Sequence, residues 1–153
     1  KIKDSDISFD IIFGPAYKGI FLGSVLATKL NKPVCFNRKE EKDHGEGGSL
    51  IGAKPEGRVL IVDDVISSGL AIREALEILK PYDVEIAGVL VTLDRQEKGQ
   101  KSDLMASAEL KSEGIDVFEI ISLDGLLDAG NIISEDDIVR IKDYREQFRG
   151  KDA

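Results

Sequence analysis

Cysteine and long apolar runs are scarce in this sequence of 153 residues. Cys35 is the only cysteine, so an internal disulfide is impossible and a buried thiol in a reducing cytosol is the expected state. No apolar run approaches the length of about 20 residues that a membrane span needs, and no segment has the pattern of a signal peptide. We therefore expect a cytoplasmic protein that does not bind membranes.

Positive charge is in the minority, because 21 lysines and arginines face 29 acidic residues and the formal net charge is −8. Such a surface should repel nucleic acid and anionic membranes, so neither is an expected partner. A local group of cations is informative against this background. One is found at Arg38, Lys39 and Lys42, next to His44, the only histidine.

The four prolines are scattered, and no repeat, linker or low-complexity tract interrupts the chain. Length and composition predict a single compact domain over residues 1–153. Because residues 9–13 already have the pattern of a core strand, we expect the sequence to be the larger part of a longer protein.

Short apolar runs alternate with segments of helical period. Strands are predicted at residues 9–13, 34–37, 59–62, 86–93 and 117–121. Helices are predicted between them, at residues 20–30, 72–79 and 104–111, and Ser134 is expected to cap a last helix. This order predicts an α/β fold, in which a mainly parallel sheet of five to six strands has helices on both faces. The first strand and the strand at residues 59–62 should be adjacent at its centre.

Ligands bind beyond the carboxyl ends of the strands in such sheets. The segment RVLIVDDVISSGLAIREA, residues 58–75, places two carboxylates, Asp63 and Asp64, at such an end. Ser67, Ser68 and Gly69 follow at a helix N-terminus, where backbone N–H groups favour an anion such as phosphate. Carboxylates beside a phosphate site are favourable only if they bind sugar hydroxyls or a hard cation, and a ribose phosphate with Mg²⁺ supplies both.

Two other interpretations compete for this segment. The carboxylates could simply solvate a strand end, with Ser67 or Ser68 as an ordinary helix cap. The run VLIVDDV also looks like the acidic pocket of a response-regulator receiver domain. That module has its acidic pair after the first strand, whereas the pair here follows a third strand, so the spacing does not fit.

The segment closely resembles the phosphoribosyl-pyrophosphate signature of the type I phosphoribosyltransferases. Three further stretches, FGPAYKGI (13–20), FNRKEEKDHGEGGSLIG (36–52) and LDRQEKG (93–99), resemble the orotate phosphoribosyltransferase branch. The resemblance runs from residue 9 to YREQF at residues 144–148. It implies a three-layer α/β/α fold with a flexible charged loop or hairpin. It also implies an enzyme of pyrimidine biosynthesis that transfers the phosphoribosyl group of 5-phosphoribosyl 1-diphosphate to orotate, giving orotidine 5′-monophosphate and diphosphate.

The resemblance also implies roles for individual residues. The catalytic group would be Lys39, Lys42, His44, Asp63 and Asp64. The phosphoribosyl diphosphate would contact Tyr17, Lys18, Arg38, Lys39, Lys42, His44, Asp63, Asp64, Val65, Ile66, Ser67, Ser68, Gly69, Leu70 and Ala71. A non-proline cis peptide would precede Tyr17, and the cations of residues 38–44 would close over the leaving diphosphate as a mobile lid.

Orotate carries a carboxylate, which Arg95 would bind by paired hydrogen bonds, with Ser67 also near the base. Mg²⁺ is the implied cofactor, with no direct protein ligand: the substrate's diphosphate and ribose would hold it, and Asp63 and Asp64 would reach it through water. The implied partners are the two small substrates and a second copy of the chain, in a homodimer where Lys39 acts in the neighbouring site.

The sequence departs from the family pattern at three points. The family carries a further segment before residue 9, with a lysine and an aromatic pair near the base, so part of the base-binding hood is absent. Ser67 stands where threonine is usual and keeps a hydroxyl, but Leu70 replaces a usual Thr or Ser and removes one hydrogen bond to phosphate. Two alternative functions stay open: transfer to another base, or a non-catalytic regulator that senses phosphoribosyl diphosphate. The acidic net charge and the complete charged loop argue against the regulator.

Overall fold

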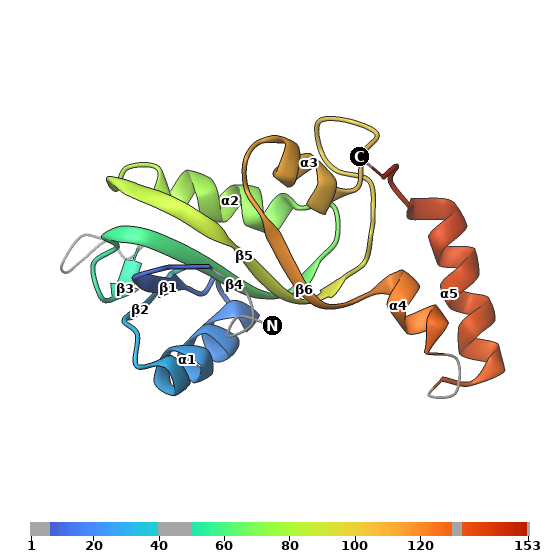
Figure 1. Cartoon of the computed structure of the whole chain (residues 1–153), viewed down its shortest axis with the longest axis horizontal. Coiled ribbons are helices and arrows are strands. Elements are labelled where there is room, and N and C mark those ends of the chain that lie inside the picture. Colours follow the sequence, from blue (N-terminus) through green and yellow to red (C-terminus); the bar gives the residue numbers. More distant parts are fainter. Residues whose placement is uncertain (1–6, 40–49, 130–132, 153) are drawn as a thin grey trace.

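The computed structural model describes residues 7–39, 50–129 and 133–152 (Figure 1). Within them, one sheet has the strand order β3-β2-β1-β4-β5-β6. Its strands are β1 (Ile11–Phe13), β2 (Val34–Asn37), β3 (Leu50–Gly52), β4 (Gly57–Ile66), β5 (Val84–Asp94) and β6 (Val117–Ser122). Every neighbouring pair is parallel except β2 and β3, which are antiparallel.

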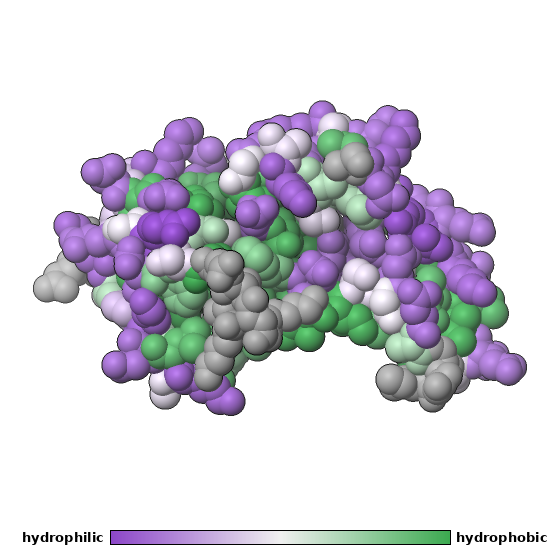
Figure 2. All heavy atoms as spheres, viewed as in Figure 1, coloured by the Kyte–Doolittle hydropathy of each residue, from purple (hydrophilic) through white to green (hydrophobic). Residues whose placement is uncertain are grey.

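Helices cover both faces of this sheet (Figure 1). They are α1 (Lys18–Leu30), α2 (Leu70–Leu79), α3 (Ala106–Ser112), α4 (Leu123–Asp128) and α5 (Glu135–Phe148). Helix α1 lies on one face, whereas α2 and α3 lie on the other, and α4 and α5 stand apart beyond β6 (Figure 1). Figure 2 shows that the molecule is hollowed between this α4–α5 lobe and the body that contains α1.

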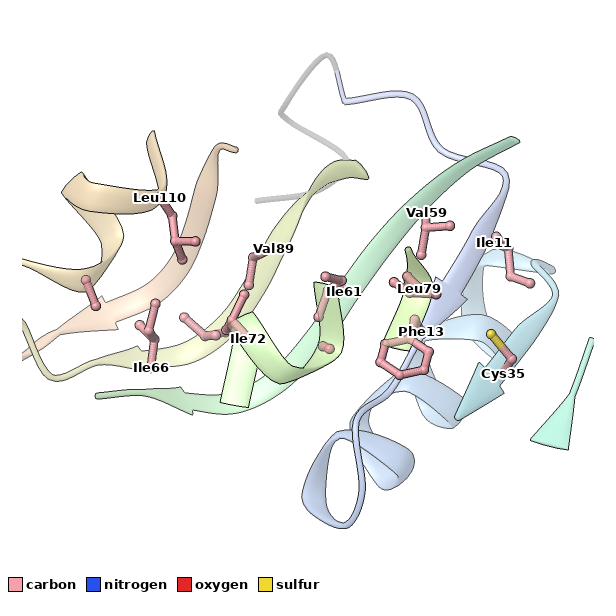
Figure 3. Packing of buried hydrophobic residues seen from close by; sticks show 13 residues of the cluster. Ile11, Phe13, Cys35, Val59, Ile61, Ile66, Ile72, Leu79, Val89 and Leu110 are labelled. Atoms are coloured by element: carbon pink, nitrogen blue, oxygen red, sulfur yellow. The ribbon is translucent and has the colours of Figure 1, made fainter. Parts of the chain in front are cut away.

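Alternation along the central strands explains the two-sided core, because successive side chains of a strand point to opposite faces. Phe13 and Ile61 pack with Ile72 of α2 in one buried cluster, part of which is drawn in Figure 3. Ile12 and Leu60 pack on the other face, in the cluster that contains Ala27 of α1. A strand buried on both faces needs a continuous aliphatic run, as residues 59–62 have.

The predicted fold is confirmed: the sheet is mainly parallel, it has helices on both faces, and β1 lies between β2 and β4 with Ile11 opposite Val59. Ser134 caps α5 as predicted, since its Oγ accepts a hydrogen bond from the backbone N–H of Asp137 at 3.2 Å. Cys35 is free and fully buried, and burial raises the pKa of its thiol to about 11. Among the described helices, none combines the length and apolar character needed to cross a membrane.

One detail of the expected fold was wrong, and two short elements were not predicted. Strand β4 does not end at Val62 but continues to Ile66, because Asp63 and the residues after it pair with residues 91–94 of β5. The acidic pair therefore lies within the last part of the strand, not after it. Strand β3 and helix α4 were not predicted as separate elements, since three and six residues are too few to show a period.

Candidate active site

The carboxyl ends of β1, β4 and β5 meet at one edge of the sheet, because the three strands are parallel neighbours. The GPAYKGI loop follows β1, and Arg95 follows β5. Residues 67–69, which follow β4, are the loop of the phosphoribosyl-pyrophosphate signature and are called the signature loop below. Residues predicted from distant parts of the sequence therefore come together at the place where α/β sheets bind ligands.

The signature loop leads into helix α2, whose N-terminus has no side-chain cap. Gly69 is the N-cap of α2, with φ 79° in the left-handed region, and no side chain of the described residues caps the helix by a hydrogen bond. Ser67 and Ser68 are therefore not the helix caps that the competing interpretation required. A side chain at position 69 would be strained, and its Cβ would lie 3.2 Å from that of Ala106. The N–H groups of the first turn of α2 and two nearby hydroxyls form a site suited to a phosphate.

Asp63 and Asp64 are adjacent, but their environments differ. Asp63 is 8% exposed, and burial raises the pKa of its carboxyl to about 6, even though the backbone N–H of Asp64 donates to its Oδ1 at 2.9 Å. Asp64 is more accessible, and its Oδ2 lies 2.7 Å from Nζ of Lys18. The hydroxyl of Thr92 on β5 donates to the Asp64 carbonyl oxygen and holds the backbone at this point.

The GPAYKGI loop connects β1 to α1. The peptide bond between Ala16 and Tyr17 is cis, as the resemblance implied. The backbone N–H of Ala16 donates to Oδ1 of Asn37 at 2.8 Å, so the end of β2 supports the loop. A Cβ at Gly14 would lie 2.3 Å from the carbonyl oxygen of Gly19, so the loop folds tightly onto the start of α1. Hydrogen bonding to Asp64 raises the pKa of Lys18, the first residue of that helix.

A pocket of about 300 Å³ opens beside this loop. It is lined by Ala16, Tyr17, Ile20, Phe36, Asn37, Arg38, Lys39 and Ile51. Nζ of Lys39 lies 5.1 Å from the centre of the Tyr17 ring, within the range of a cation–π contact. Two of the predicted lid cations thus border a pocket with Tyr17, and a dense negative charge would be favoured there.

Arg95 follows β5 directly. Its backbone N–H donates to the carbonyl oxygen of Ile66 at 2.9 Å, which fixes it beside the signature loop. Its side chain is 38% exposed and contacts Tyr144 and Glu97. The predicted reader of the base is therefore at the expected edge, but it already has partners.

A family model described as "Phosphoribosyl transferase domain" matches residues 1–122. The orotate phosphoribosyltransferase of Laribacter hongkongensis is 49% identical over 155 residues, which cover 96% of this chain and 72% of that protein. The chain belongs to the orotate phosphoribosyltransferase family. The orotate phosphoribosyltransferase of Shewanella oneidensis is 46% identical, with coverage of 96% and 72%.

Solved structures agree with this family. A crystal structure of orotate phosphoribosyltransferase from Francisella tularensis has a TM-score of 0.74 at 35% identity, covering 97% of this chain and 75% of that one. UMP synthase from Leishmania donovani has a TM-score of 0.75 at 26% identity, covering 96% and 31%. An adenine phosphoribosyltransferase from Thermoanaerobacter pseudethanolicus, at 19% identity and a TM-score of 0.55, shares the fold alone. The predicted family, the type I fold and the transferase class are confirmed, and the receiver-domain interpretation is wrong.

The structure places most of the residues that the family resemblance named. Tyr17, Lys18 and Asp64 lie together where α1 meets β4, and Arg38 and Lys39 border the adjoining pocket. Ser67 and Ser68 precede α2, whereas Leu70 and Ala71 are exposed in its first turn. Val65 and Ile66 are the last residues of β4, and the Ile66 side chain is buried in the core, so only its backbone is open to a ligand. Lys42 and His44 lie outside the described residues, and their roles stay predictions.

Four residues that shape the site were not singled out from the sequence. They are Asn37, Thr92, Glu97 and Tyr144, which support the loop, the acidic strand and Arg95. Asn37 is the last residue of a predicted strand, and its place at the binding edge could have indicated a role in the site. The contacts of Thr92 and Tyr144 span 28 and 49 residues of sequence, and no local pattern indicates such pairs.

The described residues contain no group of three or more His, Cys, Asp or Glu side chains that could hold a metal ion. Asp63 and Asp64 are adjacent carboxylates at the binding edge, and Lys18 already neutralises one of them. A hard cation prefers six or more oxygen ligands, so this pair fits Mg²⁺ only if the substrate supplies most of the ligands.

Proposed function

We propose that this chain transfers the phosphoribosyl group of 5-phosphoribosyl 1-diphosphate to orotate, with release of diphosphate and inversion at the anomeric carbon. Membership of the orotate phosphoribosyltransferase family supports the reaction. The observation that carries the assignment of residues is the uncapped N-terminus of α2, which follows closely after the strand that contains the carboxylate pair Asp63 and Asp64.

A helix N-terminus beside two carboxylates suits a sugar phosphate as the ligand. The 5′-phosphate would accept hydrogen bonds from the N–H groups of the first turn of α2 and from the hydroxyls of Ser67 and Ser68. Asp63 and Asp64 would accept hydrogen bonds from the ribose hydroxyls. As the bond from the anomeric carbon to the diphosphate oxygen breaks, positive charge develops on the ribosyl group, and two nearby carboxylates stabilise it.

The departing diphosphate would be received by cations and donors on the other side of the ribose. Tyr17 and Arg38, which border the pocket beside the GPAYKGI loop, and Lys18, next to Asp64, are proposed for this role together with Lys42 and His44. The exposed pair of Lys18 and Asp64 is weak, so a multiply charged diphosphate can draw the lysine away from its carboxylate. When bound, Mg²⁺ supplies further neutralisation of the diphosphate charge, with Asp63 and Asp64 reaching it through water.

We also propose a cytoplasmic homodimer in which Lys39 acts in the partner's site. Phe21 and Val25 of α1 are 72% and 61% exposed, and with Tyr17 they form a stripe at a spacing of four residues. Large apolar side chains in such a stripe are typical of a surface that another protein covers. The free buried thiol of Cys35 supports a reducing compartment.

One assay distinguishes these functions. Orotate absorbance is followed in the full-length protein with phosphoribosyl diphosphate and Mg²⁺, and the assay is repeated with uracil, adenine or hypoxanthine in place of orotate. We expect turnover with orotate only, and none when Mg²⁺ is removed by a chelator. Turnover with a different base would favour the transferase for another base, and binding of phosphoribosyl diphosphate without any turnover would favour the regulator.

A further inference from the structure

The guanidinium of Arg95 is held by two other side chains. Its Nη2 donates a hydrogen bond to the hydroxyl of Tyr144 and lies 2.9 Å from Oε1 of Glu97. The Tyr144 hydroxyl in turn donates to the same Glu97 oxygen. The guanidinium carbon lies 4.9 Å from the centre of the Tyr144 ring. Three side chains thus form a closed set of contacts at one end of the guanidinium.

The remaining donors of Arg95 make no hydrogen bond to the part of the chain that the structure describes. Within the described residues, Nε and Nη1 have no hydrogen-bond partner, and 38% of the side chain is exposed. A guanidinium has five N–H donors in a planar fork, which matches the two oxygens of a carboxylate. The end of Arg95 held by Tyr144 and Glu97 therefore fixes the plane of the other donors.

Tyr144 is itself anchored by the C-terminal end of α5. The carbonyl oxygen of Phe148 accepts from the backbone N–H of Lys98 at 3.0 Å, and the N–H of Gly150 donates to the carbonyl of Gln96 at 3.1 Å. The ring of Phe148 lies 4.7 Å from that of Tyr144. The end of α5 is thus attached to the loop that begins with Arg95, although Arg95 and Tyr144 are 49 residues apart in the sequence.

We propose that Tyr144 and Glu97 are positioning residues for orotate, which hold Arg95 in the orientation that receives the carboxylate of the base. This inference rests on the proposed role of Arg95. It makes α5 a specificity-determining element, because the helix supplies the hydroxyl that orients the guanidinium. Neither side chain needs to touch the base.

The hydroxyl of Tyr144 has a particular task in this arrangement. Burial, and then its hydrogen bond to Glu97, raise the pKa of Tyr144, so the hydroxyl keeps its proton and can donate to Glu97 while it accepts from Arg95. Without the hydroxyl, Glu97 would lose one donor and would compete more strongly for the donors of Arg95. The substrate carboxylate would then meet a guanidinium turned toward Glu97.

The test is Tyr144→Phe in the full-length protein, since phenylalanine keeps the ring and removes only the hydroxyl. We expect KM for orotate to rise about three- to tenfold, with kcat and KM for phosphoribosyl diphosphate changed less than about twofold. A general loss of structure would instead lower kcat and move both KM values. Tyr82→Phe, in the turn after α2, is the matched control and should leave orotate kinetics unchanged. A thermal melt of each variant checks that the fold is intact.

A double-mutant cycle with Arg95→Ala separates this inference from the role of Arg95 itself. Arg95→Ala alone should impair orotate use, and Tyr144→Phe should have no further effect in the Arg95→Ala background. If Arg95→Ala leaves orotate kinetics unchanged, the assigned role of Arg95 fails and the positioning role fails with it. If Arg95→Ala impairs orotate use but Tyr144→Phe has no effect, or has the same effect in both backgrounds, the positioning role alone is overturned.

Discussion

Asp63 and Asp64 are neighbours in the chain but differ in their surroundings. Asp63 is buried and has a pKa of about 6, whereas Asp64 is partly exposed and paired with Lys18. At neutral pH the protein therefore keeps a negative charge in a buried position where the charge destabilises the fold. Such a cost is common at sites where function requires the charge.

Asp63→Asn should raise stability above pH 6. Asp63 is neutral in both the folded and the unfolded chain below the ordinary value of 3.8, and only the unfolded chain ionises between 3.8 and about 6. The stability that comes from a neutral Asp63 is therefore fully present below pH 3.8 and is lost as the pH rises through 6. Since Asn stays neutral, the variant should gain about 2–3 kcal/mol in the free energy of unfolding at pH 7.5 and almost nothing at pH 4. Urea unfolding at the two pH values measures this, and an equal gain at both would show that burial of the charge is not its source.

Arg95→Ala tests a single contact with the base. Loss of a charge-assisted pair should reduce kcat/KM for orotate by about 2–4 kcal/mol in apparent transition-state stabilisation. Binding of phosphoribosyl diphosphate should barely change, because the N-terminus of α2 and the cations of residues 38–44 are proposed to bind it. Steady-state kinetics with each substrate varied separately measures both effects. Unchanged orotate kinetics would mean that another residue binds the carboxylate.

At the scale of elements, one buried carboxylate joins α3, α2 and the loop between β5 and α3. Glu109 is 3% exposed and accepts hydrogen bonds from Arg73 of α2, from the backbone N–H groups of Gln100 and Lys101, and from the hydroxyl of Ser102 at 2.8 Å. Nε2 of Gln100 lies 3.4 Å from the carbonyl oxygen of Ser68. The loop that begins with Arg95 is thereby attached to the helix whose N-terminus is proposed to bind phosphate.

Glu109→Gln should therefore destabilise the protein in a pH-dependent way. Although burial raises the pKa of Glu109, its hydrogen bonds outweigh that effect and lower the pKa to about 2. The carboxylate's contribution is present above the ordinary value of 4.5 and is lost as the pH falls through 2. We expect a loss of about 3 kcal/mol at pH 7 that becomes clearly smaller at pH 3 in urea unfolding. Glu113→Gln, at a side chain that is 32% exposed and also bonds to Arg73, is the control and should cost less. An equal loss for Glu109→Gln at both pH values would argue against the ionised carboxylate as its source.

At the scale of the whole molecule, the buried middle of the sheet was easier to predict from the sequence than the ends of its strands. The aliphatic run at residues 59–62 identified the central strand because that part is buried on both faces. The polar end of the same strand, through Asp63 and Asp64, carries no apolar signal, and only pairing with β5 shows that the strand continues to Ile66.

The candidate site, too, could be predicted only in part. Its loops could be located because they follow predicted strands and contain short motifs, and the structure brings Tyr17, Lys18 and Asp64 together. The supporting contacts could not be predicted, because Tyr144 reaches Arg95 only through the placement of α5 beyond β6. Contacts of this kind depend on the tertiary structure, and a single sequence does not show them.

The proposed dimer can be tested by mixing inactive variants. If Lys39 acts in the partner's site, a mixed dimer of Lys39→Ala and Asp63→Asn has one site with both changes and one intact site. Random exchange of subunits should then restore about one quarter of the wild-type sites. Asp63→Asn mixed with Arg95→Ala is the control, since both residues are proposed to serve the site of their own chain, in which case no intact site can form. No recovery in the Lys39 mixture, after exchange is verified, would place Lys39 in its own chain's site.

The steady-state turnover of a variant with both Asp63→Asn and Asp64→Asn, measured beside a thermal melt, tests the proposed site most directly. Asn keeps the shape and hydrogen-bonding capacity of Asp but removes both charges near the developing ribosyl cation. We expect the variant to melt at the wild-type temperature or higher, and to consume orotate more slowly by a factor on the order of 10²–10³ or more. Wild-type turnover with an unchanged melt would contradict the proposal, because the carboxylates would then only solvate the end of β4.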